Sequence, residues 1–243
     1  MVVGGQQTPA GGSGRQPIGN RLLDGLPAQE FERLRPELEL RSLRTREVLF
    51  EPGQPVGYVW FPVDSIISVL VPLQRGPVDG ATIGREGAVA LGSLLGAESV
   101  SRQMVCQVAG TAYRMPAAAF QTALRRDGQL RARMERYALA FLNDLLQSVA
   151  CNRRHDLQQR YSRWLLATHD RVNRDELELS HEFLALMLGV RRTSVSLASQ
   201  QFQRAGLIRY SRARLTIADR SGLEETACEC YMAIRAEYER LWL

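Results

Sequence analysis

Apolar residues recur at helical spacing in the most clearly patterned stretch of the chain, residues 180–217. Four apolar side chains share one helical face: Phe183, Leu184, Met187 and Leu188. Ser180 stands just before them and is a good N-cap, because its hydroxyl can accept an otherwise unpaired backbone N–H. Gly189 can adopt the left-handed conformation that ends a helix. The pattern predicts a short helix that ends at Gly189.

A second helix is predicted directly after this turn. Its inner face carries Val195, Ala198, Phe202 and Ala205. Its outer face carries Thr193, Leu197, Gln200 and Arg204, with Ser196 at the edge. The outer face is small, polar or basic and has no acid, and the major groove of DNA accepts a helix of this kind. Residues 207–210 and 214–217 then predict two strands of a wing. We call residues 180–217 the reader.

Residues 38–115 have a different pattern, in which short apolar runs alternate with turn signals such as Glu51-Pro-Gly. Several short strands at this spacing predict a sandwich or barrel-like roll. A short helix over residues 88–95 is expected to interrupt it. Before the roll, residues 21–36 predict a short helix, which Pro27 divides.

Helical patterns return after the roll, over residues 116–126, 129–152 and 156–172. The long middle helix carries a stripe at nearly 3.5-residue spacing: Leu130, Met134, Tyr137, Phe141, Leu145 and Ser148. This spacing is typical of a two-helix coil. It favours self-pairing of two chains through this stripe, and the alternative is that the stripe packs on the roll.

Two further elements complete the prediction. Residues 176–179 predict a short strand beside the wing. Residues 219–243 predict one terminal helix with six acids and three arginines. An acidic helix is poorly suited to DNA, so we expect it to pack on the reader or to meet another protein.

The distribution of charge favours nucleic acid as the partner of the reader. Between residues 181 and 217 there are six arginines and one acid, an excess equal to the net charge of +5 of the whole chain. Basic residues concentrated on one small module are typical of a phosphate-binding surface. The alternative is a helix pair that only packs and keeps its arginines in water.

Composition excludes several other classes. No apolar run approaches the roughly 18 residues of a membrane helix, and the N-terminus lacks a signal peptide, so we expect a soluble, cytoplasmic protein without a membrane partner. HExxH, GxSxG and GxxxxGK[ST] are absent and the three histidines are scattered. We therefore expect no enzyme and no catalytic residues.

The four cysteines do not predict a metal site. They form no CxxC pair, and Cys228 and Cys230 would point in different directions if both lay on a helix. We expect Cys106, Cys151, Cys228 and Cys230 to be free thiols, and we assign no metal ligand.

The order of roll, long helix and reader resembles the Crp/Fnr superfamily of bacterial transcription regulators. The best-matching residues are Leu186-Met-Leu-Gly-Val-Arg-Arg-Thr-Ser-Val-Ser and Leu207-Ile-Arg-Tyr. Tyr58-Val-Trp-Phe-Pro and Gly84-Arg-Glu-Gly in the roll are also similar. The resemblance extends from about residue 20 to residue 217.

This resemblance implies an α+β fold with a cyclic-nucleotide-binding-like β-roll, a long dimerisation helix and a winged helix-turn-helix. The expected divisions are a disordered tail over 1–19, a sensor roll over 20–128, a dimerisation helix over 129–155, a DNA-binding domain over 156–217 and a C-terminal helix over 218–243.

The resemblance also implies a homodimer whose second reader helices enter successive major grooves about 34 Å apart. Arg192, Thr193 and Leu197 occupy positions that contact bases in the catabolite activator, and only the arginine is retained. Leu197 could contact a thymine methyl group. The remaining candidates for DNA contact, mainly to phosphates, are Arg191, Ser194, Ser196, Gln200, Arg204, Arg212 and Arg214.

The effector pocket of the family is matched only in part. Gly84-Arg-Glu-Gly is a partial match to the nucleotide-binding turn, and Arg102 is followed by Gln103 where the family has a hydroxyl residue. The candidate effector residues are Arg85, Glu86 and Arg102, with Glu86 accepting a ribose hydroxyl and Arg102 pairing with a phosphate. The alternative is a surface turn and a solvated arginine. A cyclic nucleotide is therefore disfavoured, no cofactor is assigned, and the cysteines and motifs of iron–sulfur and haem sensors are absent.

The leading hypothesis is a homodimeric, sequence-specific transcription regulator with double-stranded DNA and RNA polymerase as partners. The alternative is a ligand-binding or protein-interaction module whose helix-turn-helix no longer reads DNA.

Overall fold

The computed structural model describes residues 16–74 and 76–241. Most of the predicted tail, residues 1–15, lies outside this range. At its end, Ile18 and Gly19 donate backbone N–H groups to the Asp24 carboxylate at 2.7 and 3.0 Å. The predicted helix over 21–36 divides at Pro27 into α1 (Arg21–Asp24) and α2 (Ala28–Leu34), followed by the 3-10 turn η1 (Arg35–Glu37).

The roll is built from two antiparallel sheets. One has the order β1-β7-β3 and the other β2-β6-β4-β5. The strands are β1 (Glu39–Leu43), β2 (Val48–Phe50), β3 (Tyr58–Pro62), β4 (Ile66–Val71), β5 (Val78–Ile83), β6 (Gln103–Val108) and β7 (Gly110–Pro116). A core between the sheets takes side chains from both, including Trp60, Ile67 and Cys106. The predicted helix over 88–95 is a 3-10 helix, η2 (Leu91–Leu95).

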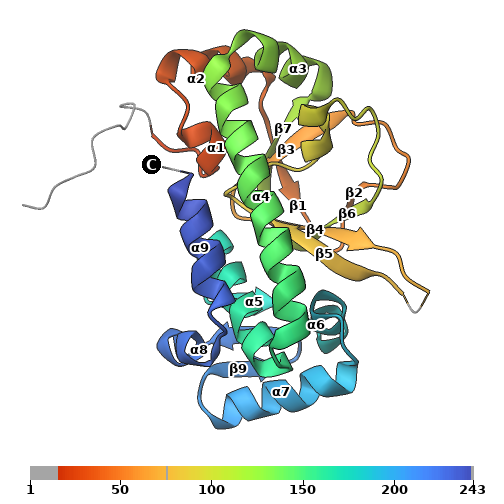
Figure 1. The fold of residues 1–243 in the computed structure, drawn as a ribbon, viewed down its shortest axis with the longest axis vertical. Helices are drawn as coiled ribbons and strands as arrows, with labels where there is room; N and C mark the ends of the chain where they lie inside the picture. Colours follow the sequence, from red (N-terminus) through yellow and green to blue (C-terminus); the bar gives the residue numbers. More distant parts are fainter. Residues whose placement is uncertain (1–15, 75, 242–243) are drawn as a thin grey trace, which may run out of the picture.

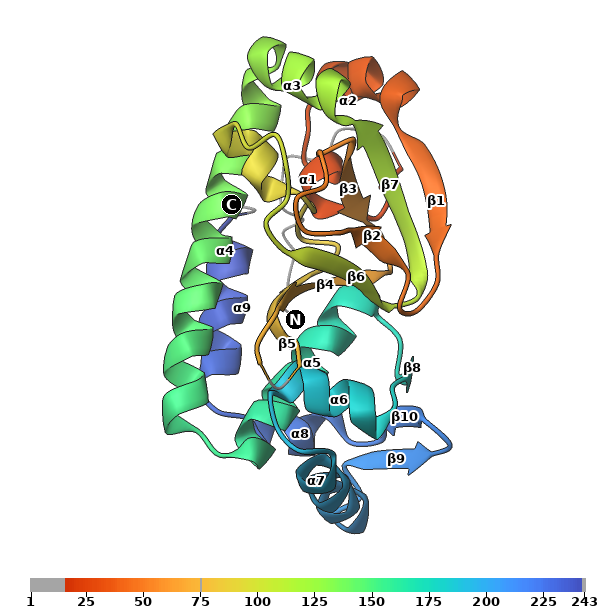
Figure 2. The same cartoon turned by 90° about the vertical axis from the view of Figure 1, so that its right-hand side faces the viewer.

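Two helices lead out of the roll, α3 (Ala117–Arg126) and α4 (Gly128–Arg154). The long helix α4 runs the length of the molecule beside the roll (Figures 1 and 2). His155 follows it in an extended conformation, and Asp156 then caps α5 (Leu157–Val172) through a capping box with Gln159.

The reader has the predicted local structure. Helix α6 (His181–Leu188) begins where the Ser180 hydroxyl accepts the Phe183 N–H, and it ends at Gly189 with φ of 65°. Helix α7 (Arg192–Arg204) follows. Strands β9 (Ile208–Ser211) and β10 (Arg214–Ile217) form the wing, and β8 (Glu176–Glu178) pairs with the outer side of β10.

The reader and the roll share a continuous core. Ile66, Leu70 and Val108 of the roll belong to the same apolar cluster as the buried residues of α5, α6 and α7. The Ser68 hydroxyl lies 3.3 Å from the Met187 sulfur of α6. The reader is therefore docked directly on sheet β2-β6-β4-β5.

The prediction of a single terminal helix is wrong. Residues 220–240 form two helices, α8 (Arg220–Thr226) and α9 (Cys230–Arg240), which are separated by an extended segment at Ala227. Figure 1 shows α9 lying alongside α4, and the Asn143 side chain donates to Glu237 at 2.6 Å. This acidic segment packs on α4 and α5 rather than on α7.

The prediction that two chains pair through the stripe over residues 130–148 is wrong for the first three residues of that stripe. Leu130, Met134 and Tyr137 are at most 1% exposed because they pack against α1, α2 and the roll. A different stripe of α4 faces outward, with exposed fractions of 51–62%: Leu139, Leu142, Leu146 and Val149. We call these four residues the α4 stripe. Both sets have coiled-coil spacing, and burial against the roll distinguishes them.

The predicted fold class is confirmed, with a strand-rich N-terminal roll, a long helix and a C-terminal helix-turn-helix with a wing. Among the described residues, none of the helices is both long and apolar enough to span a membrane.

Candidate nucleic-acid interface and interdomain cavity

Helix α7 is fixed by its inner face. Val195, Ala198 and Phe202 are at most 3% exposed. The Phe202 ring stacks on Tyr161 of α5, with centroids 5.2 Å apart and planes 17° apart. The Tyr161 hydroxyl also lies 3.2 Å from the Ser199 hydroxyl. Because this face is rigidly packed, the orientation of the opposite face is set by the fold.

The outer face of α7 lies at the end of the molecule farthest from α3 (Figure 1). Six of the predicted DNA-contacting residues are exposed there: Arg191, Arg192, Thr193, Leu197, Gln200 and Arg204. Leu197 is 58% exposed, so its apolar side chain is available to a partner. Helix α7 itself carries no acid, so its exposed face is basic, polar or apolar along its length.

Ser194 and Ser196 are less available than the sequence pattern indicated. Both are half-buried, and the Ser196 hydroxyl lies 2.9 Å from Nδ1 of His181. The His181 ring stacks on Tyr210, with centroids 4.3 Å apart. Burial, together with the nearby Arg192 guanidinium, lowers the pKa of His181. Ser196 therefore helps to join α7 to α6 and the wing.

Two arginines of the reader have acidic neighbours. Arg192 pairs with Glu182 of α6, and Nη1 of Arg214 lies 3.6 Å from Oε1 of Glu176. Glu176 belongs to β8, which pairs with β10, so the charge count over 181–217 did not include it. Four other arginines have no ion pair within the described part of the chain: Arg191, Arg204, Arg209 and Arg212.

The wing ends in a two-residue turn. Arg212 and Ala213 both have positive φ, 48° and 64°. Turns of this kind match the twist of a hairpin, but they favour Gly, Asn or Asp at both positions. The turn places exposed Arg212 between β9 and β10, at the tip of the wing. Figure 2 shows the wing at the same end of the molecule as α7.

A cavity of about 1010 Å³ lies between the roll and the helices that follow it, which we call the helical domain. Its walls come from β5, α4, α5, α6 and α9. Of the three predicted effector residues, Arg85 and Glu86 line it and Arg102 does not. The exposed Arg102 side chain instead donates to the backbone carbonyl of Ser101 at 2.9 Å.

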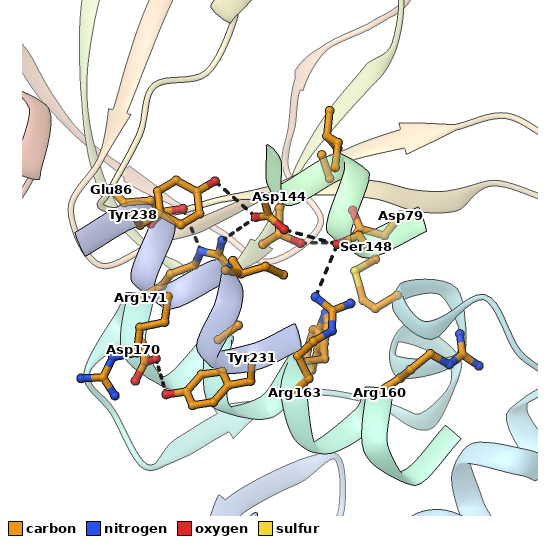
Figure 3. A pocket seen from close by; sticks show the side chains of 18 of the residues that line it. Asp79, Glu86, Asp144, Ser148, Arg160, Arg163, Asp170, Arg171, Tyr231 and Tyr238 are labelled. Atoms are coloured by element: carbon orange, nitrogen blue, oxygen red, sulfur yellow. Dashed lines mark hydrogen bonds and ion pairs between the residues drawn. The ribbon is translucent and has the colours of Figure 1, made fainter. Parts of the chain in front are cut away.

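The Glu86 carboxylate already forms an ion pair with Arg171 of α5, a residue of the helical domain. Nε of Arg171 donates to Oε1 of Glu86 at 2.8 Å, and its Nη2 lies 3.8 Å from Asp144 of α4 (Figure 3). The same Glu86 oxygen accepts the Gly84 N–H at 3.0 Å. A Cβ on Gly84 would lie 2.7 Å from the Arg171 side chain. The Gly84-Arg-Glu-Gly turn therefore joins the two domains, a role the motif alone did not indicate.

Asp79 of β5 adds an unusual carboxyl group to the cavity. It accepts a hydrogen bond from the Thr82 hydroxyl at 2.9 Å. Burial raises its pKa to about 7, although Arg171 acts in the opposite direction. The cavity thus contains a carboxyl group that titrates near neutrality, at the joint between the roll and the reader.

Comparison with known proteins agrees with this arrangement. Residues 159–226 match the model of the Crp-like helix-turn-helix domain. The chain has the Crp/Fnr fold. FixK2 from Bradyrhizobium japonicum has a similar structure, with a TM-score of 0.66 at 17% identity over 79% of this chain and 98% of that one. The Crp/Fnr resemblance seen in the sequence is confirmed.

Other solved regulators share the Crp/Fnr fold. A CRP-family transcriptional regulator from Thermus thermophilus superposes with a TM-score of 0.62 at 20% identity, covering 77% of this chain and 96% of that one. The c-di-GMP-responsive global regulator CLP from Xanthomonas campestris gives 0.58 at 16% identity, covering 79% and 99%. None of the curated protein sequences matches the chain significantly.

Proposed function

We propose that the chain is a homodimeric, sequence-specific DNA-binding regulator of transcription. The observation that carries the proposal is the outer face of α7, where Arg192, Thr193 and Leu197 are exposed while the inner face is locked on α5. A fixed helix with a basic and partly apolar outer face can contact base edges and a thymine methyl group in the major groove.

The α4 stripe supports the homodimer. Four large apolar side chains at spacings of three, four and three residues are 51–62% exposed, and monomers rarely leave such a continuous row in water. Pairing of two α4 helices through this stripe would bury the stripe. It would also relate the two readers by a twofold axis, as binding in successive major grooves requires.

The cavity is where an effector would act in this proposal. A ligand there would touch the roll through β5 and the helical domain through α5, so it could favour one placement of the reader over another. RNA polymerase remains an expected partner of the DNA-bound dimer.

The proposal is tested by selecting tight-binding duplexes from a random pool with the purified chain, with and without candidate nucleotides. We expect an enriched, roughly palindromic motif with half-sites one helical turn apart. Binding should weaken steeply with salt, because phosphate contacts release counterions. Selection that yields no motif at any salt concentration would favour a module whose helix-turn-helix does not read DNA.

The homodimer has its own test. Leu146→Asp places a charge in the α4 stripe without touching α7, and we expect it to convert the dimer to a monomer in analytical ultracentrifugation. Leu95→Asp is a matched control, because Leu95 is 82% exposed but lies outside the stripe. A wild-type chain that sediments as a monomer at micromolar concentration would contradict the proposed dimer.

A further inference from the structure

Three cysteines and one histidine from two distant parts of the sequence meet at the C-terminal end of α4. Cys151 lies in the last turn of α4 and His155 follows the helix directly. Cys228 lies between α8 and α9, and Cys230 begins α9. The three cysteines are at most 4% exposed, and the side chain of His155 is 14% exposed. We call these four residues the Cys/His cluster.

The ligand atoms of the Cys/His cluster converge on one point. All four lie within 4.8 Å of one another. The sulfurs of Cys151 and Cys228 are 3.5 Å apart, and Nδ1 of His155 is 3.6 Å from the Cys230 sulfur. Bonds of about 2.3 Å to sulfur and 2.0–2.1 Å to nitrogen place tetrahedral ligands about 3.5–3.8 Å apart. These two separations therefore match a single tetrahedral ion.

The surroundings of the cluster fit metal ligands. Nε2 of His155 lies 3.2 Å from the Glu229 carboxylate, so Nδ1 is left free to bind a metal, as in the carboxylate–histidine–zinc arrangement. The Gln147 amide lies 3.0 Å from the Cys230 sulfur and can donate to a thiolate. The Arg163 guanidinium acts electrostatically on Cys151. Its positive charge would partly balance the single negative charge of a Zn²⁺ ion bound by three thiolates.

We propose that Cys151, His155, Cys228 and Cys230 bind one Zn²⁺ ion. Three thiolates and one imidazole in tetrahedral arrangement are the ligand set of structural zinc sites. An iron–sulfur cluster spreads its ligands over two or more irons, whereas these atoms surround one point. A Cys151–Cys228 disulfide would use two of the four residues and would leave His155 and Cys230 without a role.

The zinc ion would join three elements at the place where the chain passes from α4 to α5. It would tie the end of α4 to the segment between α8 and α9, directly before α5 begins. Because all four tetrahedral positions are filled by protein, the site would have no open position for a substrate. Its role would be to hold the acidic C-terminal helices against α4 and to fix the joint at His155.

The first test measures metal directly and needs no DNA. The full-length chain, purified under reducing conditions without chelator, should contain close to one zinc per chain by elemental analysis. Replacement by Co²⁺ should give the intense visible bands and the sulfur-to-cobalt charge-transfer band of a tetrahedral thiolate site. A reduced, folded chain that contains no zinc and binds Co²⁺ without these bands would overturn the proposal.

Variants then assign the ligands. Cys228→Ser and Cys151→Ser should each lower zinc affinity at least about 100-fold, and Glu229→Gln should lower it by about 10-fold because it only orients His155. Cys106→Ser is the matched control, since Cys106 is equally buried but lies in the roll. Unchanged affinity in both cysteine variants would overturn the ligand assignment.

Two further measurements address stability and the disulfide. Removal of zinc by a strong chelator should lower the Tm of the wild-type chain by about 5–10 °C and should leave the already metal-free Cys228→Ser variant unchanged. Mass spectrometry of the chain from reducing cells should show four free thiols after metal release. A Cys151–Cys228 disulfide found there instead would overturn the zinc site.

Discussion

Three exposed arginines of the reader and two arginines that line the cavity have opposite surroundings. At the reader, Arg191, Arg204 and Arg212 are exposed, and none of them forms an ion pair with a described residue. Around the cavity, Arg171 contacts Glu86 and Asp144. Arg220 contacts Asp170, and it also donates to the Tyr231 hydroxyl at 2.7 Å.

The difference shows how one residue type serves two purposes in this chain. A guanidinium surrounded by carboxylates is already satisfied and holds elements together. One without an acid in reach keeps its charge available to an anion from outside, such as a phosphate. Position relative to acids, rather than arginine content, therefore distinguishes these two arginines of the cavity from these three arginines of the reader.

The largest expected effect comes from removing the buried arginine that pairs with two acids beside the cavity. Arg171→Ala would leave Glu86 and Asp144 without their cation, and we expect the free energy of unfolding to fall by about 3–5 kcal/mol. Urea unfolding followed by circular dichroism measures the change. Arg209→Ala, at an exposed arginine of the reader, is the control and should stay within about 0.5 kcal/mol of wild type. Equal effects of the two substitutions would contradict the distinction between the two groups of arginines.

The second prediction concerns Asp79, a carboxyl group that lines the same cavity and on which Arg171 acts electrostatically. The folded chain holds the Asp79 proton up to about pH 7, whereas the unfolded chain releases it near pH 4. The free energy of unfolding should therefore fall as pH rises from 4 to 7, by at most about 4 kcal/mol from this group.

Asp79→Asn isolates this contribution, because the amide cannot lose a proton. The Tm of the wild type minus that of the variant should decrease from pH 5 to pH 8. A difference that stays constant across this range would show that Asp79 does not titrate in the folded chain as the cavity implies.

The third prediction concerns Arg192, the arginine of the reader that pairs with Glu182. Arg192→Ala should reduce discrimination at one base pair of the selected motif by about 1–3 kcal/mol and leave the other positions unchanged. Glu182→Gln removes the partner of Arg192 and should strengthen binding to the same motif. Competition binding with single-base variants of the motif measures both. Uniform weakening over all base pairs in Arg192→Ala would assign Arg192 to a phosphate instead.

The reader could be predicted in detail because its signals are local. Ser180, Gly189 and the spacing of apolar residues each act within a few positions, and the structure has the helices where they indicate. The α4 stripe was missed because two sets of residues on one helix have the same spacing. Only the roll, which buries Tyr137 and leaves Leu142 exposed, distinguishes them.

The remaining sites depend on contacts between distant residues. Arg171 reaches Glu86 across 85 positions, and Cys151 meets Cys228 across 77. No spacing rule covers such separations. Cys228 and Cys230 do not share a helix, because Cys228 precedes α9, and both sulfurs can therefore face the same point.

The smallest expected effect is at the wing tip, where two substitutions of Arg212 together separate the effect of charge from that of backbone strain. Arg212→Ala removes the charge but keeps a residue that disfavours the positive φ of 48°. Arg212→Asn removes the same charge and tolerates this conformation. Both should weaken binding about equally across DNA sequences and reduce the slope of log affinity against log salt by about 1. Only Arg212→Asn should also raise the free energy of unfolding, by about 0.5–1 kcal/mol.

If the Asn variant bound as tightly as wild type, strain rather than charge would explain any loss in the Ala variant, and Arg212 would not be a phosphate contact.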